Sequence, residues 1–309
     1  MNRSKIIGFL ICCLLVAMSL LSIMAQQNKL TPRSIEINHR PTGENPISPS
    51  KPQRIVSMSP GHTEILFALG AGDRVVGVTS YSDYPEEAKT KPSIGGYHAP
   101  DVEKIIALSP DIVFSMGDIQ KKYTRMLEQA GIMVVDVDPK TMPEILTAIN
   151  IISEAIGEQE RGAQLYGDLA RRLSEVRRLT AGTRAPKVFL EIWDTPLLTV
   201  GNRSFIHDMI IQAGGINVAG DQRVDYTPCD MEKLYAYNPE MYIVISHSRN
   251  DIRSFIVRPE LADLAAVNNN QVYHVVDDLL ARPGPRSFIG LVKLAEILHP
   301  DEMKFWEIK

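Results

Sequence analysis

Short apolar runs alternate with amphipathic stretches along most of the chain. The runs RIVSM (54–58) and VVGVT (75–79) predict buried strands, and each is followed by a polar loop and a helical stretch. The same order restarts with KVFLEIW (187–193). Because strands that alternate with helices favour a parallel sheet covered on both faces, we predict an α/β fold with two lobes, each a mainly parallel sheet flanked by helices.

A long helical stretch separates the two sets of strands. Its second part, which begins near Glu158, has charges on one side and apolar residues at three-to-four spacing, which is typical of an amphipathic helix. We therefore expect one long rigid connecting helix over 157–182, between an N-terminal lobe at 54–156 and a C-terminal lobe at 183–309. The apolar positions are Leu165, Leu169, Leu173, Val176 and Leu179.

An internal repeat links the two lobes. DVEKIIALSPD, which begins at Asp101, returns as DMEKLYAYNPE, which begins at Asp230. In each copy the Asp is placed to cap a helix, a Glu follows in the first turn, and a proline ends the helix before an apolar strand. The glutamates, Glu103 and Glu232, should occupy equivalent exposed positions. They either form a functional pair or only favour a helix start, which contributes up to about 1 kcal/mol.

The first 53 residues differ in character from the rest. Residues 1–25 carry Arg3 and Lys5 before an uncharged run, so they are expected to be a signal peptide or an N-terminal membrane anchor. Residues 26–53 are polar and rich in proline, which predicts a flexible linker. The protein should therefore be exported to the periplasm or the outer face of the cytoplasmic membrane, and associated with the membrane if the leader is not cleaved.

Composition excludes several classes of function. The net charge of -4 provides no basic surface, so no nucleic-acid partner is expected. Only one of the three cysteines, Cys229, lies beyond the leader, and no cluster with metal-ligand spacing is present. No phosphate-binding loop, zinc-protease or serine-hydrolase motif occurs. We therefore expect neither an enzyme nor a resident metal or cofactor.

The loops after the predicted strands contain the residues most suited to binding a ligand, because ligands of such sheets lie beyond the carboxyl ends of the strands. The aromatic ones have flat apolar faces and polar edges, which suit a large, partly polar ligand. They are equally suited to ordinary packing, and Asp278 and Arg282 either meet a ligand or pair with each other. The full set of candidates is His62 and His98 on the predicted rim, Tyr81, Tyr97, Trp193, Tyr226, Asp278 and Arg282.

Three stretches resemble a known family. RIVSMSPGHTEILFALGAGDRVVGVTSYSDYPEEA, DVEKIIALSPD and the closing RPGPR are similar to the extracytoplasmic substrate-binding proteins of iron-chelate and cobalamin importers, above all to the cobalamin-binding members. The resemblance covers about 54–300. It implies the class III periplasmic-binding-protein architecture, a monomer, and delivery of ligand to an ABC permease and its ATPase subunits.

The resemblance also implies roles for individual residues. Glu103 and Glu232 match the glutamates that meet permease arginines in this family. Five of the candidates match cleft positions of the cobalamin-binding members, and Trp193 lies within about one residue of a sixth. Tyr97 and Tyr226 replace tryptophans of those members. The five are Tyr81, Tyr97, Tyr226, Asp278 and Arg282.

The ligand stays open between three chelates. We expect cobalamin, or another corrinoid, bound between the lobes as the transported ligand. A ferric siderophore or haem is the alternative, because a tyrosine-rich cleft also accepts these and Tyr97 or His98 would then approach the iron. A second alternative is an exported enzyme acting in the interlobe cleft, which the missing catalytic motifs disfavour.

Overall fold

The computed structural model describes residues 51–246, 258–304 and 306. The leader expected at 1–25 and nearly all of the linker expected at 26–53 lie outside these residues. Within the described ranges, no helix is both long and apolar enough to cross a membrane.

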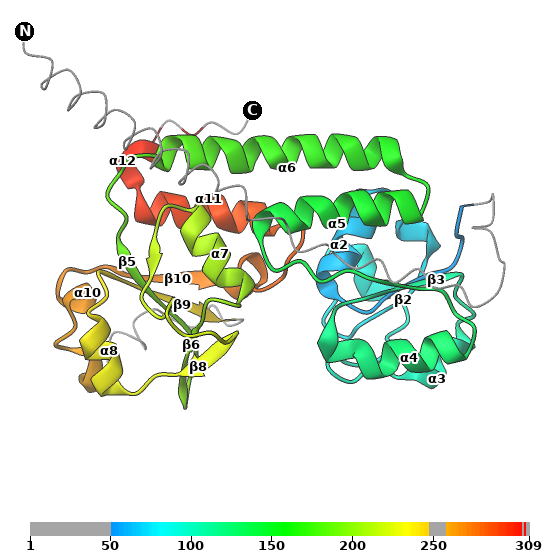
Figure 1. The fold of residues 1–309 in the computed structure, drawn as a ribbon, viewed down its shortest axis with the longest axis horizontal. Coiled ribbons are helices and arrows are strands. Elements are labelled where there is room, and N and C mark those ends of the chain that lie inside the picture. The colour runs from blue at the N-terminus through cyan, green and yellow to red at the C-terminus, as the bar shows by residue number, and fades with distance from the viewer. Residues whose placement is uncertain (1–50, 247–257, 305, 307–309) are drawn as a thin grey trace, which may run out of the picture. The chain divides into compact units, whose positions relative to one another are not determined.

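Helices and strands alternate over the described chain, as the sequence pattern predicts (Figure 1). The helices are α2 (Pro60–Ala68), α3 (Val102–Ala107), α4 (Lys121–Gln129), α5 (Met142–Ala155), α6 (Gln159–Thr180), α7 (Phe205–Gln212), α8 (Met231–Tyr237), α10 (Ala265–Asn268), α11 (Ser287–Leu298) and α12 (Pro300–Met303). The strands are β1 (Ile55–Ser57), β2 (Val75–Val78), β3 (Ile112–Ser115), β4 (Val134–Asp136), β5 (Lys187–Asp194), β6 (Leu197–Val200), β7 (Ile216–Asn217), β8 (Tyr226–Pro228), β9 (Met241–Ser246) and β10 (Val272–Val276).

The N-terminal lobe, from β1 to α5, is built on a four-stranded parallel sheet in the order β2-β1-β3-β4. Val56 on β1 lies opposite Val113 on β3, which lies opposite Val134 on β4. Every residue of β1 and β3 is buried, which explains why these strands are continuous apolar runs in the sequence rather than alternating ones.

The C-terminal lobe, from β5 to α12, contains a mixed sheet in the order β10-β9-β5-β6-β8, with β7 also paired to β5. Strands β7, β9 and β10 join parallel to their neighbours, and β6 and β8 join antiparallel. The parallel part, β7-β5-β9-β10, has the same order as β2-β1-β3-β4. The antiparallel β6 and β8 are an addition that the sequence did not predict. The predicted fold class, two mainly parallel α/β lobes, is confirmed.

The repeat has the same local structure in both lobes. The carboxylate of Asp101 accepts a hydrogen bond from the backbone N–H of Lys104 at 3.1 Å, and Asp230 accepts one from Lys233 at 2.7 Å. Each cap opens a helix of six or seven residues, α3 or α8, that leads into a buried strand, β3 or β9. The predicted unit of cap, helix, turn and strand is therefore confirmed twice.

Helix α6 connects the lobes and shares their core. It packs against α5 of the N-terminal lobe and α11 of the C-terminal lobe, and Figure 1 shows α6 running alongside both, with α11 under one half of its length and α5 under the other. Leu169, Leu173 and Val176 are buried in a single hydrophobic cluster that also includes residues of β1, α2, β5 and α11. Because this cluster continues from one lobe to the other, α6 is a packed part of both rather than a free tether, as the predicted rigid helix requires.

Candidate functional site

Several residues that could contact a ligand follow the carboxyl ends of the parallel strands in the N-terminal lobe. Strand β1 leads into the start of α2, and β2 leads into the loop that contains Tyr81. Gly117 follows β3, and Asp138 follows β4. A methyl group at Gly117, where φ is +66°, would lie 2.0 Å from Asp138 Oδ2, so the backbone and this carboxylate are in close approach.

A buried glutamine holds Tyr97 beside these strand ends. Gln120 Nε2 donates to the Met58 carbonyl at 2.7 Å and to the Tyr97 carbonyl at 2.9 Å. Its Oε1 accepts from the Met116 backbone N–H at 2.8 Å. Gln120 therefore fixes the Tyr97 backbone against the ends of β1 and β3. The sequence analysis missed it, since a single Gln in a polar stretch gives no signal of burial.

Buried hydroxyl groups join the loops after β1 and β2. Thr63 Oγ1 lies 2.9 Å from Ser57 Oγ and 3.0 Å from Ser82 Oγ. Ser82 Oγ also lies 2.9 Å from Thr79 Oγ1. Because each hydroxyl has a partner, the loop that carries Tyr81 is attached to the start of α2 at little desolvation cost.

The environment of Tyr97 is partly buried and acidic. Its ring meets His98 edge-on, with centroids 4.9 Å apart at 84°. Burial raises the pKa of Tyr97, and the negative fields of Asp138 and Asp136 raise it further. The hydroxyl is therefore neutral at physiological pH.

Two aromatic candidates of the C-terminal lobe lie on its antiparallel strands. Trp193 is near the end of β5 with 60% of its surface exposed, and its Nε1 donates to the Thr195 carbonyl at 2.9 Å. Tyr226 begins β8 and is 53% exposed, and Tyr81 of the other lobe is 54% exposed. Three large aromatic side chains of the candidate set thus remain open to solvent, and their contact with a ligand stays a prediction.

Asp278 and Arg282 pair with each other and also join the lobes. Arg282 lies 2.6 Å from Asp278 and forms a second ion pair with Asp83 of the N-terminal lobe. The pairing that the sequence left open is therefore present, and contact of either residue with a ligand stays a prediction. The sequence analysis missed Asp83, because it lies 199 residues from Arg282 along the chain.

A second arginine of the RPGPR motif makes a more buried junction. Arg286 Nη2 lies 2.7 Å from Glu64 Oε1, a carboxylate that is almost fully buried, and its guanidinium stacks 4.0 Å from the Tyr84 ring centroid. Burial raises the pKa of Glu64, and the pairing with Arg286 opposes that shift. A methyl group at Gly61 would meet the Pro283 carbonyl at 2.2 Å, so only glycine fits this contact between α2 and the motif.

The two candidate histidines have opposite environments. His98 is exposed, as expected for the rim. His62 is fully buried inside α2, 6.4 Å from the Phe114 ring, and burial lowers its pKa to about 4. The expectation that His62 lies on a rim is wrong. The reason is that α2 is covered on nearly all sides, with six consecutive residues buried from Gly61 to Leu66.

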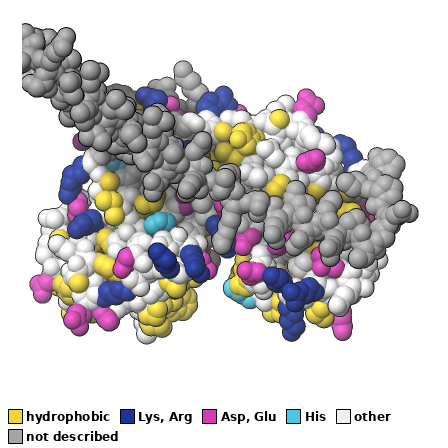
Figure 2. Space-filling view, viewed as in Figure 1, with side chains coloured by type: hydrophobic (Ala, Val, Ile, Leu, Met, Phe, Trp, Pro, Cys, Tyr) yellow, Lys and Arg dark blue, Asp and Glu magenta, His cyan; other side chains and the backbone are white. Residues whose placement is uncertain are grey.

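Metal-ligating side chains are not gathered within the described part of the chain. There, no group of three or more His, Cys, Asp or Glu residues is arranged to hold a metal ion. Cys229 is buried, and burial raises the pKa of its thiol to about 11, so the thiol is protonated at neutral pH. Acidic and basic side chains intermingle over the visible face (Figure 2).

The two repeat glutamates are exposed at equivalent positions. Glu103 and Glu232 each lie in the first turn of their helix, and neither forms an ion pair within the residues that the structure covers. Ile106 and Tyr235 follow three residues later on the same helix faces, with 43% and 38% of their surfaces exposed. Each lobe thus presents one carboxylate beside one apolar side chain.

Comparisons with known proteins identify the family. A model described as "Periplasmic binding protein" matches residues 55–279. The chain belongs to this family. It is 31% identical over 262 residues to an uncharacterized ABC transporter substrate-binding lipoprotein of Bacillus subtilis, covering 82% of each chain. It is 29% identical over 252 residues to the vitamin B12-binding protein of Vibrio cholerae, covering 81% of this chain and 90% of that one.

Solved structures agree on the fold but belong to proteins named for different ligands. The periplasmic vitamin B12-binding protein of Vibrio cholerae matches with a TM-score of 0.73 at 27% identity, over 83% of this chain and 99% of the other. A periplasmic heme-binding protein from Roseiflexus matches with a TM-score of 0.72 at 28% identity, over 81% and 99%. The resemblance seen in the sequence is thereby confirmed for the family, which consists of binding proteins, and the ligand stays open.

Proposed function

We propose that the protein is the extracytoplasmic receptor of an ABC importer and captures a corrinoid between its two lobes. The observation that carries this proposal is the presence of exposed aromatic faces in both lobes. Tyr81 follows a parallel strand of one lobe, while Trp193 and Tyr226 lie on the strands of the other. Flat faces with polar edges suit a macrocycle that is apolar on its faces and polar around its rim.

The junction between the lobes supports capture without a wide hinge motion. Two ion pairs join the N-terminal lobe to the C-terminal lobe, Glu64–Arg286 and Asp83–Arg282. The Gly61 backbone also contacts the RPGPR motif. Such contacts keep the aromatic groups of both lobes in a fixed relation. A preorganised site loses less conformational entropy on binding than a site that must assemble.

Haem or a ferric siderophore is the second candidate. The Tyr97–His98 pair favours it, because His98 is exposed and a phenol and an imidazole beside each other are both potential iron ligands. A periplasmic heme-binding protein with the same fold supports this alternative. Coordination of the iron by Tyr97 or His98 would shift the absorbance spectrum of the chelate, whereas stacking of aromatic rings alone would change the spectrum little.

Titration of the exported protein with cyanocobalamin, haemin and ferrioxamine tests the proposal. Replacing Tyr81, Tyr97 and Tyr226 together by alanine should weaken binding of the preferred chelate by about 2–4 kcal/mol, since each stacked aromatic contributes about 1 kcal/mol. The matched control is Tyr166→Ala on α6, another partly exposed tyrosine, which should bind normally. A folded triple variant that binds as tightly as the unmodified protein would disprove the assignment of these residues.

Delivery to the permease is assigned to the repeat glutamates. Glu103 and Glu232 present one negative charge per lobe, each beside an exposed apolar residue. Paired carboxylates suit paired arginines on a two-fold related permease. Contacts of this kind contribute modestly to affinity but determine orientation and speed encounter.

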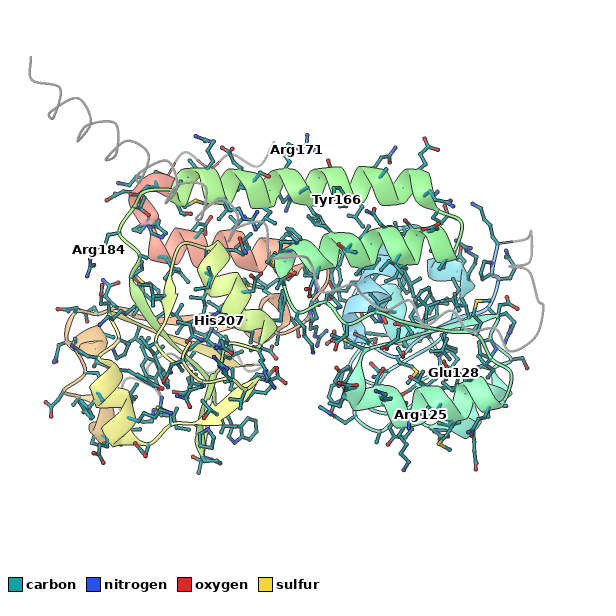
Figure 3. All side chains as sticks on the ribbon, viewed as in Figure 1. Arg125, Glu128, Tyr166, Arg171, Arg184 and His207 are labelled. Carbon is teal, nitrogen blue, oxygen red and sulfur yellow. The ribbon has the colours of Figure 1, made fainter. Side chains whose placement is uncertain are left out.

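Charge reversal separates docking from a purely structural role. We expect Glu103→Lys/Glu232→Lys to bind the chelate normally, to melt near the unmodified protein, and to fail to support uptake through the reconstituted permease. The control reverses two exposed acids of α6, Asp168→Lys/Glu175→Lys, and should support uptake. Figure 3 shows Arg171, the ion-pair partner of Asp168, projecting from α6 on the side away from α5 and α11. Normal uptake by Glu103→Lys/Glu232→Lys would show that the two glutamates only favour the starts of their helices and do not take part in docking.

A further inference from the structure

The two arginines of the RPGPR motif, Arg282 and Arg286, are already engaged by carboxylates. Arg282 is held between Asp83 and Asp278, and only 11% of its side chain is exposed. Arg286 is held by Glu64, lies 3.7 Å from Asp278, and is 15% exposed. Releasing either guanidinium to meet an anionic ligand would leave a poorly solvated carboxylate behind, which costs several kcal/mol for a buried one such as Glu64.

The carboxylates around Tyr97 are less completely neutralised. Asp136 accepts hydrogen bonds from Ser115 Oγ at 2.6 Å and from the Gly117 N–H at 2.8 Å, and both donors are uncharged. These bonds stabilise the ionised carboxylate without cancelling its charge. Asp138 is paired with Lys140 at 2.9 Å.

The opposite lobe adds another negative charge. Asp225 directly precedes Tyr226, is exposed, and forms no ion pair with any residue that the structure covers. Lys140, which pairs with Asp138, is the one cation bound to any of these three carboxylates among the residues that the structure covers. The surroundings of Tyr97 and Tyr226 are therefore acidic overall.

Resting on the capture site proposed above, we propose that this site selects chelates whose periphery is neutral or cationic and discriminates against those that carry carboxylates. Peripheral amides donate N–H groups, which the carboxylates of Asp136, Asp138 and Asp225 accept. A peripheral carboxylate of the ligand is repelled by the same three carboxylates. It also has no free arginine of the RPGPR motif to pair with, because Arg282 and Arg286 are already paired. This favours a corrinoid with amide side chains over a porphyrin with free acid side chains.

Matched pairs of chelates that differ in one functional group measure this selectivity. Cyanocobalamin is compared with its monocarboxylic acid, in which one amide is hydrolysed. Haemin dimethyl ester is compared with haemin, and ferrioxamine B with its N-succinyl derivative. We expect the neutral or cationic member of every pair that binds to bind about three- to ten-fold more tightly at low salt, the range for one or two partly screened charge contacts.

Two variants and a salt series attribute the preference to the named charges. Asp225→Asn removes an exposed charge that no described contact uses, and should reduce the ratio within each pair about two-fold. Asp138→Asn/Asp225→Asn should bring it close to one. Asp168→Asn on α6 is the matched control and should leave it unchanged. Raising salt to about 500 mM should also reduce the ratio, since the Debye length then falls below about 5 Å.

The outcomes separate the two proposals. If a pair binds through the aromatic residues but its carboxylate member binds equally or more tightly, the capture site stands and the charge selectivity is wrong. If the ratio persists unchanged in Asp225→Asn and in the double variant, the selectivity has another origin and this proposal fails. If no member of any pair binds, the capture site itself is wrong and the selectivity falls with it.

Discussion

The two lobes share a strand order but stabilise the buried polar groups at their central strands, β1 and β5, differently. In the N-terminal lobe, uncharged hydroxyl groups hydrogen-bond one another, with Thr63 at the centre between Ser57 and Ser82. In the C-terminal lobe, a buried carboxylate takes that place. Glu191 on β5 is 1% exposed, accepts a hydrogen bond from the Tyr242 hydroxyl, and pairs with Arg258 at 2.5 Å.

This difference has an energetic consequence. A hydroxyl network desolvates only weakly polar groups, so each of its hydrogen bonds contributes about 1 kcal/mol. A buried ion pair contributes little net stability, yet loss of one partner leaves an uncompensated charge and costs about 3–5 kcal/mol. The polar group on the central strand of the C-terminal sheet should therefore be more sensitive to single substitutions than the hydroxyl groups around Thr63. Glu64 of the N-terminal lobe shares this sensitivity, because it is buried and pairs with Arg286 of the other lobe. It also contains the antiparallel β6 and β8, which the N-terminal lobe lacks.

The largest effect is expected when the cation is removed from the buried cluster of Glu191, Tyr242 and Arg258. Arg258→Met should destabilise the protein by about 3–5 kcal/mol, because Glu191 and Tyr242 remain buried without the cation. The N-terminal counterpart, Thr63→Val, should cost about 1–2 kcal/mol. Urea unfolding monitored by tryptophan fluorescence measures both changes in the free energy of unfolding.

A double variant tests the explanation rather than the size of the effect. Glu191→Leu/Arg258→Met removes both charges together and should recover part of the stability lost in Arg258→Met, the remainder being the cost of the Tyr242 hydroxyl that stays buried without its acceptor. A double variant as unstable as the single one would show that packing around Arg258, rather than an unpaired charge, causes the loss.

Local pattern was enough to predict much of the fold. The repeat was read correctly because its signals lie within about eleven residues: an Asp that caps, apolar residues at helical spacing, and a proline that ends the helix. The connecting helix was predictable because Leu169, Leu173 and Val176 define one buried face. Each of these features depends on neighbours in sequence, and tertiary contacts only reinforce them.

The parts that were missed depend on contacts between distant residues. Glu64 and Arg286 are 222 residues apart, and Glu191 and Arg258 are 67 apart, so no window of sequence contains either pair. His62 was misplaced because it follows a predicted strand, as rim residues do, although its helix is covered on nearly every side. Tyr81 was found because loops after strands are a recognisable class of position. Trp193 and Tyr226 were expected in such loops as well, and that expectation is wrong, because they lie on β5 and β8.

The buried histidine gives the N-terminal lobe its own weakness, which appears in acid. The pKa of His62 falls from its ordinary value of 6.5 to about 4 in the folded protein, because burial disfavours the charged ring. The unfolded chain therefore binds a proton as pH falls below about 6.5, while the folded protein does not until about pH 4. Stability should be fully present above pH 6.5 and fall by up to about 3 kcal/mol as pH drops to about 4.

Replacing His62 separates its contribution to the pH dependence of stability from the contributions of other titratable groups. His62→Met should flatten the dependence of the free energy of unfolding on pH between about 6.5 and 4, measured by urea denaturation at several pH values. His98→Met is the control, since His98 is exposed and its loss should leave the slope unchanged. An equal slope in His62→Met would mean that other groups are responsible.

The smallest expected effect compares the two repeat copies at one backbone position. Each copy reaches its proline through a residue with positive φ, which is Ser109 at 46° in the first copy and Asn238 at 44° in the second. Asn tolerates this left-handed conformation because its short amide can hydrogen-bond locally, whereas Ser has less compensation. Ser109→Gly should therefore raise the melting temperature slightly, by relief of at most about 1 kcal/mol, while Asn238→Gly should change it little or lower it. Calorimetry of the two variants decides between them, because the opposite order would show that side-chain contacts, rather than backbone strain, determine which residue each copy carries.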